Sequence, residues 1–203
     1  MLLNLATLAT LSTLGSVVSA ANIYTYFQPG CGGCGTFFKD IGPQTCALSY
    51  RGTNNATEAV EKQWTGIQSA KLQVWSPANK VFQLWRAGPG LDNATKLPLQ
   101  CGTETVAKDV TYFETCIDVP GTGASWYKPN PNQLKRADRG DHKCTSSQEF
   151  AGWWDSKKQQ HYTKEGMTQD EKDEMDAIMK SGGGAPDKFN NFKVDAPEVK
   201  PAN

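Results

Sequence analysis

The sequence KLQVWSPANKVFQLW, residues 71–85, contains two apolar runs separated by the turn-forming residues SPANK. Valine, phenylalanine and tryptophan in such runs favour β-strands, and a short connection that contains proline favours a hairpin. Alternation places Leu72 and Val74 on one face of the first run, whereas the inward face of the second run stays open. The stretch therefore predicts a β-hairpin and a chain rich in strands.

Similar runs occupy the chain on both sides of this stretch. NIYTYF (22–27) stops before a Pro-Gly pair, and DVTYFETCIDV (109–119) stops at another. Runs of β-branched and aromatic residues bounded by proline and glycine are typical of short strands. We predict a mainly β fold over residues 21–120, a small disulfide-stabilised antiparallel sandwich, with a short α-helical C-terminal appendage.

The first twenty residues indicate the compartment. Residues 1–20 contain no charged side chain and run through leucines and valines to Val-Ser-Ala, which predicts a secretory signal peptide. The run is too short and too polar to predict membrane insertion. We expect a secreted, extracellular protein, and the Asn-Ala-Thr sequons at Asn55 and Asn93 predict glycosylation.

The cysteine count agrees with secretion. An even number of cysteines in an oxidising compartment favours full pairing, although six cysteines allow fifteen pairings and spacing does not choose among them. We predict that all of them form disulfides: Cys31, Cys34, Cys46, Cys101, Cys116 and Cys144.

The Cys-x-x-Cys spacing of Cys31 and Cys34 is also that of a redox dithiol or half a metal site. A redox dithiol uses a following helix to lower a thiol pKa, but residues 35–43 show no helical pattern. Zinc needs a second closely spaced ligand pair, which Cys101 and Cys116 do not form. We expect structural disulfides and no metal or cofactor, with a thiol–disulfide redox role as an alternative.

Charge and catalytic residue types limit the function. The chain has 21 basic and 21 acidic residues, so it lacks the basic excess that favours nucleic acid. Both histidines lie beyond residue 140, which leaves the strand-rich part without an imidazole base. We predict no catalytic residue, although a carboxylate pair in a secreted carbohydrate-active hydrolase remains an alternative.

Two tryptophans are candidates for binding. Trp75 and Trp85 flank the expected turn, and outward-facing rings there form an aromatic platform for an extracellular protein or glycan. Packing in the core is the other interpretation, because buried aromatic rings supply much of a small core.

The C-terminal part has a different pattern. Residues 121–143 are rich in Gly, Pro and Asn and predict a linker, with a dibasic processing site at Lys135 and Arg136. Capping-box patterns at residues 146–149 and 168–171 predict two short helices within a helical segment, 144–180. Residues 181–203 lack periodicity and predict a disordered tail.

The motifs YTYFQPGCGG (24–33) and IGPQTC (41–46), after an uncharged leader, resemble small secreted cysteine-rich proteins of filamentous fungi, some of which are βγ-crystallin-like or killer-toxin-like sandwiches. The resemblance covers about residues 22–120 and implies disulfide roles only, for Cys31, Cys34, Cys46, Cys101 and Cys116. Together with the missing catalytic signature, it leads us to expect an effector-like binding protein that acts at a host or competitor surface without catalysis.

Overall fold

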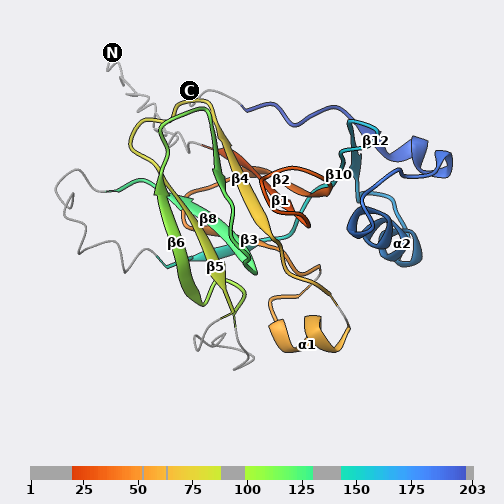
Figure 1. Ribbon diagram of the computed structural model, residues 1–203, viewed down its shortest axis with the longest axis horizontal. Coiled ribbons are helices and arrows are strands. Elements are labelled where there is room, and N and C mark those ends of the chain that lie inside the picture. The colour runs from red at the N-terminus through yellow and green to blue at the C-terminus, as the bar shows by residue number, and fades with distance from the viewer. Residues whose placement is uncertain (1–19, 52, 63, 88–98, 130–142, 200–203) are drawn as a thin grey trace, which may run out of the picture.

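The computed structural model describes residues 20–51, 53–62, 64–87, 99–129 and 143–199. Within these residues the chain is mainly β and forms two sheets, as Figure 1 shows. The predicted signal peptide lies almost wholly outside the described residues, as do the dibasic site and Asn93. No helix in the described ranges is long and apolar enough to cross a membrane.

The larger sheet has seven strands within the described residues. Their spatial order is β12 (Lys193–Val194), β11 (Gln160–Thr163), β10 (Gly152–Asp155), β2 (Gly35–Ile41), β1 (Ala21–Tyr26), β4 (Ser69–Val74) and β7 (Glu114–Ile117). All neighbouring pairs in this sheet are antiparallel.

The smaller sheet has five strands within the same ranges. Their order is β6 (Thr103–Asp109), β5 (Val81–Arg86), β8 (Gly123–Tyr127), β3 (Thr45–Leu48) and β9 (Ser146–Gln148). The pair β3 and β9 is parallel, so this sheet is mixed rather than purely antiparallel.

The predicted hairpin at residues 71–85 is wrong, although both of its strands form. Strand β4 pairs with β1 and β7, whereas β5 pairs with β6 and β8 in the other sheet. Leu72 and Leu84 both point into one core and are fully buried. The SPANK segment therefore carries the chain from one sheet to the other. Each strand buries its apolar side chains in the core that the two sheets share.

The two sheets share one hydrophobic core. Strand β1 alternates, with Ile23 facing the core and Tyr24 facing outward. Phe82 and Trp126 of the smaller sheet belong to the same core as Ile23 and are fully buried. Burial of each such side chain contributes about 1.5–3 kcal/mol, so residues far apart in sequence hold the layers together.

The first helix predicted in the C-terminal part is wrong, because residues 146–163 contain three strands. Trp153 of β10 is fully buried in the core, and the neighbouring Trp154 packs with the outward-facing cluster. This alternation has the period of a strand. Pairing of β10 with β2 supplies backbone hydrogen bonds that the local sequence does not reveal.

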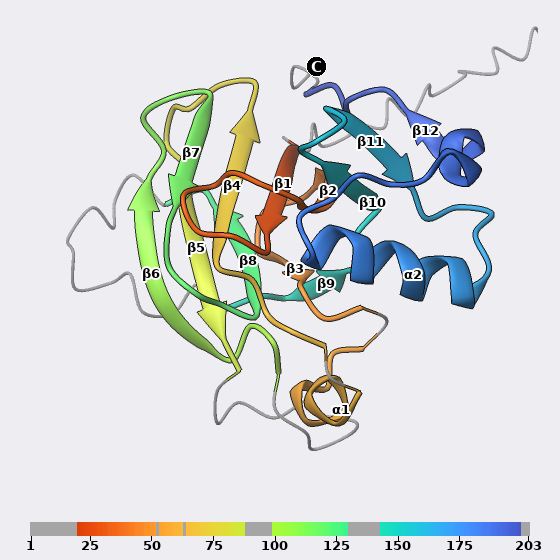
Figure 2. The same cartoon turned by 45° about the vertical axis from the view of Figure 1, so that its right-hand side comes forward.

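The second predicted helix is confirmed as α2 (Gln169–Lys180). The Thr168 side chain caps its N-terminus, and the Thr168 N–H in turn donates to the Glu171 carboxylate. Met175 and Met179 are fully buried and belong to the same core as Trp153. Helix α2 lies against β10, as Figure 2 shows, so it covers part of the larger sheet.

The predicted tail and linker also differ from the structure. Residues Asp187–Phe192 form a 3₁₀ helix that buries Phe189, and β12 then pairs with β11, so residues 181–194 are not disordered. Strand β8 begins at Gly123 and lies at the centre of the smaller sheet, within the predicted linker. Both segments gain order from tertiary contacts that their composition does not encode.

A short helix, α1 (Ala56–Glu61), begins within the first sequon. Asn55 is its N-cap, and the side-chain oxygen accepts hydrogen bonds from the backbone N–H groups of Thr57 and Glu58. The buried face of α1 consists of Ala56 and Ala59, which belong to a small cluster beside the main core.

Candidate functional site

Two disulfides join distant parts of the chain. Cys31 in the turn after β1 bonds to Cys116 of β7, and Cys46 of β3 bonds to Cys101 just before β6. Closing loops of this length stabilises a fold by about 4 kcal/mol in the chain-entropy model. The prediction of disulfides is therefore confirmed for these four cysteines.

Cys34 is not in a disulfide, contrary to the prediction. Its side chain is fully buried, and its sulfur lies 3.1 Å from the Ser156 hydroxyl and accepts a hydrogen bond from the Ser156 N–H. Cys31 points away toward β7, where it is bonded to Cys116. The Cys-x-x-Cys motif therefore contains neither a dithiol nor an internal disulfide in this structure.

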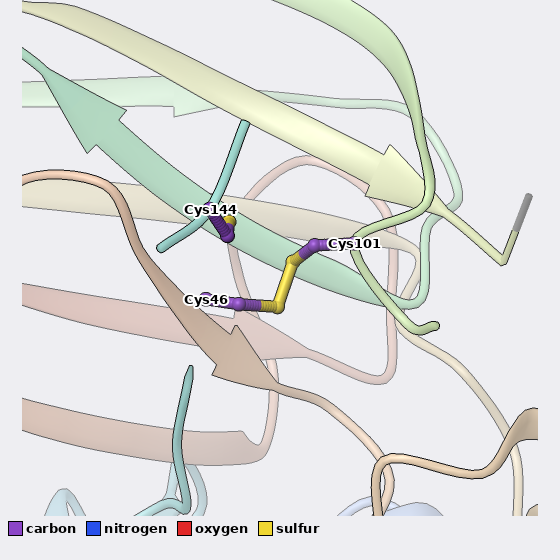
Figure 3. A group of neighbouring side chains, drawn as sticks. All are labelled: Cys46, Cys101 and Cys144. Atoms are coloured by element: carbon purple, nitrogen blue, oxygen red, sulfur yellow. A yellow bond between two sulfur atoms is a disulfide. The ribbon is translucent and has the colours of Figure 1, made fainter. Parts of the chain in front are cut away.

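Cys144 is also unbonded, contrary to the prediction that all six cysteines form disulfides. Its thiol lies beside the Cys46–Cys101 disulfide, as Figure 3 shows, and the three sulfur atoms are all within 4.8 Å of one another. Burial raises the pKa of the Cys144 thiol to about 11, against the opposing effect of a hydrogen bond with Ser125.

The two candidate tryptophans have opposite environments. Trp85 is buried, and its indole N–H donates to the Ser125 hydroxyl at 2.8 Å, so a binding role for this residue is wrong. Trp75 is 57% exposed immediately after β4. The alternation of apolar and polar residues does not predict which tryptophan is exposed. Trp75 lies just after the end of β4, whereas Trp85 lies within β5, and these positions decide the exposure.

Two further exposed aromatic residues lie near the end of β4, and the sequence pattern did not single them out. Tyr112 is 74% exposed and Phe113 64% exposed in the segment before β7. The register pairs Gln73 with Glu114, and the Val74 N–H donates to the Phe113 carbonyl. Trp75 and Tyr112 therefore both lie just beyond the last paired residues, at the same end of the sheet.

Polar side chains continue this row along the two strands. Gln73 donates to the Glu114 carboxylate at 2.6 Å, and the Lys71 ammonium lies 3.2 Å from its other oxygen. Partial burial alone would raise the pKa of Glu114, but these bonds and the Lys71 charge lower it. We define the β4–β7 face by its residues: Lys71, Gln73, Trp75, Tyr112 and Glu114.

A cleft of about 830 Å³ forms a second candidate site between α1, α2 and the nearby loops. Trp64 lies in its wall with the Arg51 guanidinium 5.3 Å and the Lys62 ammonium 5.3 Å from its ring centre. Its acidic side chains are each paired with a basic one, in the pairs Lys62–Glu58, Lys164–Glu149, Arg51–Asp173 and Arg51–Asp176.

The sequon at Asn55 caps α1, one of the helices that line this cleft, and its geometry is compatible with modification. The capping bonds use the side-chain oxygen Oδ1, whereas a glycan attaches to the nitrogen Nδ2. The other sequon, Asn93, and the dibasic pair Lys135 and Arg136 are outside the described residues.

Comparisons with protein-family models, with curated proteins and with solved structures give no match for this chain. Within the described residues, the candidate functional features are the β4–β7 face, the charged cleft and the three neighbouring sulfur atoms.

Proposed function

We propose that this chain is a secreted, effector-like binding protein that acts without catalysis at a host or competitor surface, and that its β4–β7 face binds a neutral glycan there. The observation that carries the proposal is the pair Trp75 and Tyr112, exposed by 57% and 74% and located just beyond the paired Gln73 and Glu114 at one end of β4 and β7. Contiguous exposed aromatic side chains are uncommon on a protein surface without a partner.

The chemistry of the face suits a sugar ring. Flat aromatic side chains offer apolar area to the C–H face of a pyranose, and neighbouring polar groups can bond its hydroxyls. Gln73, Glu114 and Lys71 supply amide, carboxylate and ammonium groups beside the rings. Their charges pair with each other, which favours a neutral sugar over a charged one.

The scaffold supports the same proposal. We infer that the two sheets form a disulfide-stabilised sandwich of the kind found in small secreted cysteine-rich proteins of filamentous fungi. The shared core and the two disulfides support this inference. Cys116 lies in β7 itself, so its bond to Cys31 ties the proposed binding face to the turn after β1.

Binding to insoluble neutral polysaccharides tests the proposal. Depletion of the purified protein by β-glucan, cellulose or chitin gives an affinity, and Trp75→Ala is expected to weaken it about tenfold, the equivalent of 1.4 kcal/mol. Val60→Ala is the matched control, because Val60 is 67% exposed on α1, outside the face. Equal binding by Trp75→Ala, Tyr112→Ala and the native chain would contradict the proposal, as would no binding to any of the polymers.

A second candidate function is hydrolysis by a carboxylate pair in the charged cleft. Asp173 and Asp176 are favoured for it because both line the cleft from one helix and burial raises the pKa of Asp176. Both are held by Arg51, which makes free acid and base roles less suitable. Release of reducing ends that disappears in Asp176→Asn would support hydrolysis over binding alone.

A further inference from the structure

We propose that Cys46, Cys101 and Cys144 form a thiol–disulfide exchange site, in which the Cys144 thiol displaces Cys101 from Cys46 and a Cys46–Cys144 disulfide results. The inference is independent of glycan binding. It rests on a thiol and a disulfide whose three sulfur atoms lie within 4.8 Å of one another. Exchange requires such an approach, because the attacking sulfur must contact one sulfur of the existing bond.

The Cys46–Cys101 disulfide packs closely on the backbone of β8. The disulfide lies over Gly123 of β8, where a Cβ atom would be 2.6 Å from the Cys101 sulfur and 3.0 Å from the Cys46 sulfur. Trp85 and the three cysteines belong to the same side cluster. The sulfur atoms therefore occupy a shared apolar site whose floor is backbone.

Strand pairing selects Cys46 as the sulfur that Cys144 attacks. Cys144 lies two residues before β9, and β9 is already paired with β3, which contains Cys46. The Thr145 N–H donates to the Gln44 carbonyl at 2.8 Å, next to the pairing of Thr45 with Ser146. A Cys46–Cys144 bond therefore joins two segments that the fold already holds side by side.

The exchange is balanced and needs no oxidant. Cys144 loses its proton to solvent, and its thiolate attacks the Cys46 sulfur. The Cys46–Cys144 bond forms as the Cys46–Cys101 bond breaks, and Cys101 leaves as a thiolate that takes up a proton. One disulfide and one thiol are present before and after the step.

The consequence is a change in what the disulfide connects. The Cys46–Cys101 bond joins two parts of the chain that both precede the predicted processing site at Lys135. A Cys46–Cys144 bond instead ties the C-terminal part to β3. After cleavage at the predicted processing site, the position of the disulfide would thus determine whether the C-terminal fragment stays covalently linked to the rest of the fold.

The variant Cys101→Ala tests directly whether the Cys144 sulfur can reach the Cys46 sulfur in the full chain. It leaves Cys46 and Cys144 as thiols, and oxidised glutathione supplies the oxidant, releasing two molecules of reduced glutathione as the bond closes. Peptide mapping without reduction is expected to find Cys46 linked to Cys144. Cys144→Ala is the control and is expected to keep the Cys46–Cys101 bond. A variant Cys101→Ala that folds but forms no Cys46–Cys144 bond would overturn the proposal.

Exchange in the native chain is the second measurement and does not depend on a variant folding. The folded protein is held at about pH 5 and about pH 9, because the thiolate fraction rises roughly tenfold per pH unit below the thiol pKa. Acid quenching and alkylation are then expected to find Cys101 alkylated and Cys144 bonded to Cys46 only after the alkaline incubation. The Cys34→Ala variant should behave in the same way. Persistence of Cys46–Cys101 alone at both pH values contradicts exchange.

Discussion

The Trp153 indole N–H donates to the Asp176 carboxylate at 2.6 Å, and both side chains are buried. The bond joins β10 to α2, and the other carboxylate oxygen lies 3.2 Å from the Arg51 guanidinium. One carboxylate thus connects a strand, a helix and the wall of the charged cleft.

Removing this carboxylate is expected to destabilise the fold. Asp176→Ala leaves the Trp153 N–H unpaired and reduces the pairing of Arg51, and loss of one partner from a buried ion pair costs about 3 kcal/mol. Asp176→Asn keeps an oxygen that can accept from Trp153 and should cost less. Urea unfolding measures both variants, and an alanine variant as stable as the native chain would contradict this role.

The same carboxylate predicts a dependence of stability on pH. Burial raises the pKa of Asp176 above its usual 3.8, while the bond from Trp153 and the charge of Arg51 oppose the shift. The folded state therefore holds this proton more tightly than the unfolded state does. Its stabilising effect is fully present below pH 3.8 and is lost as the pH rises through the raised pKa. The free energy of unfolding of Asp176→Asn, measured as a function of pH, should lack the decrease caused by ionisation of Asp176.

His161 predicts a pH effect of the opposite sign. Burial, aided by the charge of Lys71, lowers the pKa of His161 from 6.5 to about 4, and its ring nitrogen lies 3.0 Å from the Tyr24 hydroxyl. The unfolded state binds the proton more tightly, so stability is present above pH 6.5 and is lost as the pH falls toward 4. Unfolding curves of His161→Gln should show a weaker loss, whereas His142→Gln, at the other histidine, should keep it.

Asn55 allows glycosylation to be separated from helix capping. Asn55→Asp removes the sequon and keeps a good N-cap, whereas Asn55→Ala removes both and should cost about 1 kcal/mol. After expression through a eukaryotic secretory pathway, mass spectrometry is expected to show loss of the glycan in both variants. Thermal unfolding is expected to show destabilisation by loss of the cap only in Asn55→Ala. An unmodified Asn55 in the native chain would contradict the glycosylation prediction.

Cleavage at Lys135 and Arg136 has an expected outcome that follows from the two disulfides. Both bonds lie between residues 31 and 116, so a kexin-type protease should produce two fragments that separate in a denaturing gel without reductant. Under native conditions the fragments should stay together, because β10 pairs with β2 and β9 pairs with β3. Fragments that stay linked in the denaturing gel after the alkaline incubation would be expected from a Cys46–Cys144 bond.

Features set by neighbouring residues were predictable from the sequence. The β-rich character of residues 71–85 follows from their side chains, and the start of α2 follows from Thr168 and Glu171, which lie three residues apart and cap the helix reciprocally. Met175 and Met179 lie four residues apart, so the buried face of α2 was also visible. These signals are local because a helix bonds within itself.

Tertiary structure alone decided the features that depend on distant partners. The strand that contains Trp153 exists because β2 pairs with it, more than a hundred residues earlier in the chain. The burial of Trp85, the exposure of Trp75 and the position of Cys144 beside the Cys46–Cys101 disulfide also depend on segments distant in sequence. The amino-acid sequence by itself determined a β-rich chain with one well-capped helix. The sheet to which each strand belongs, and which sulfur atoms lie together, depend on packing between segments that are distant in sequence, and local patterns do not encode such packing.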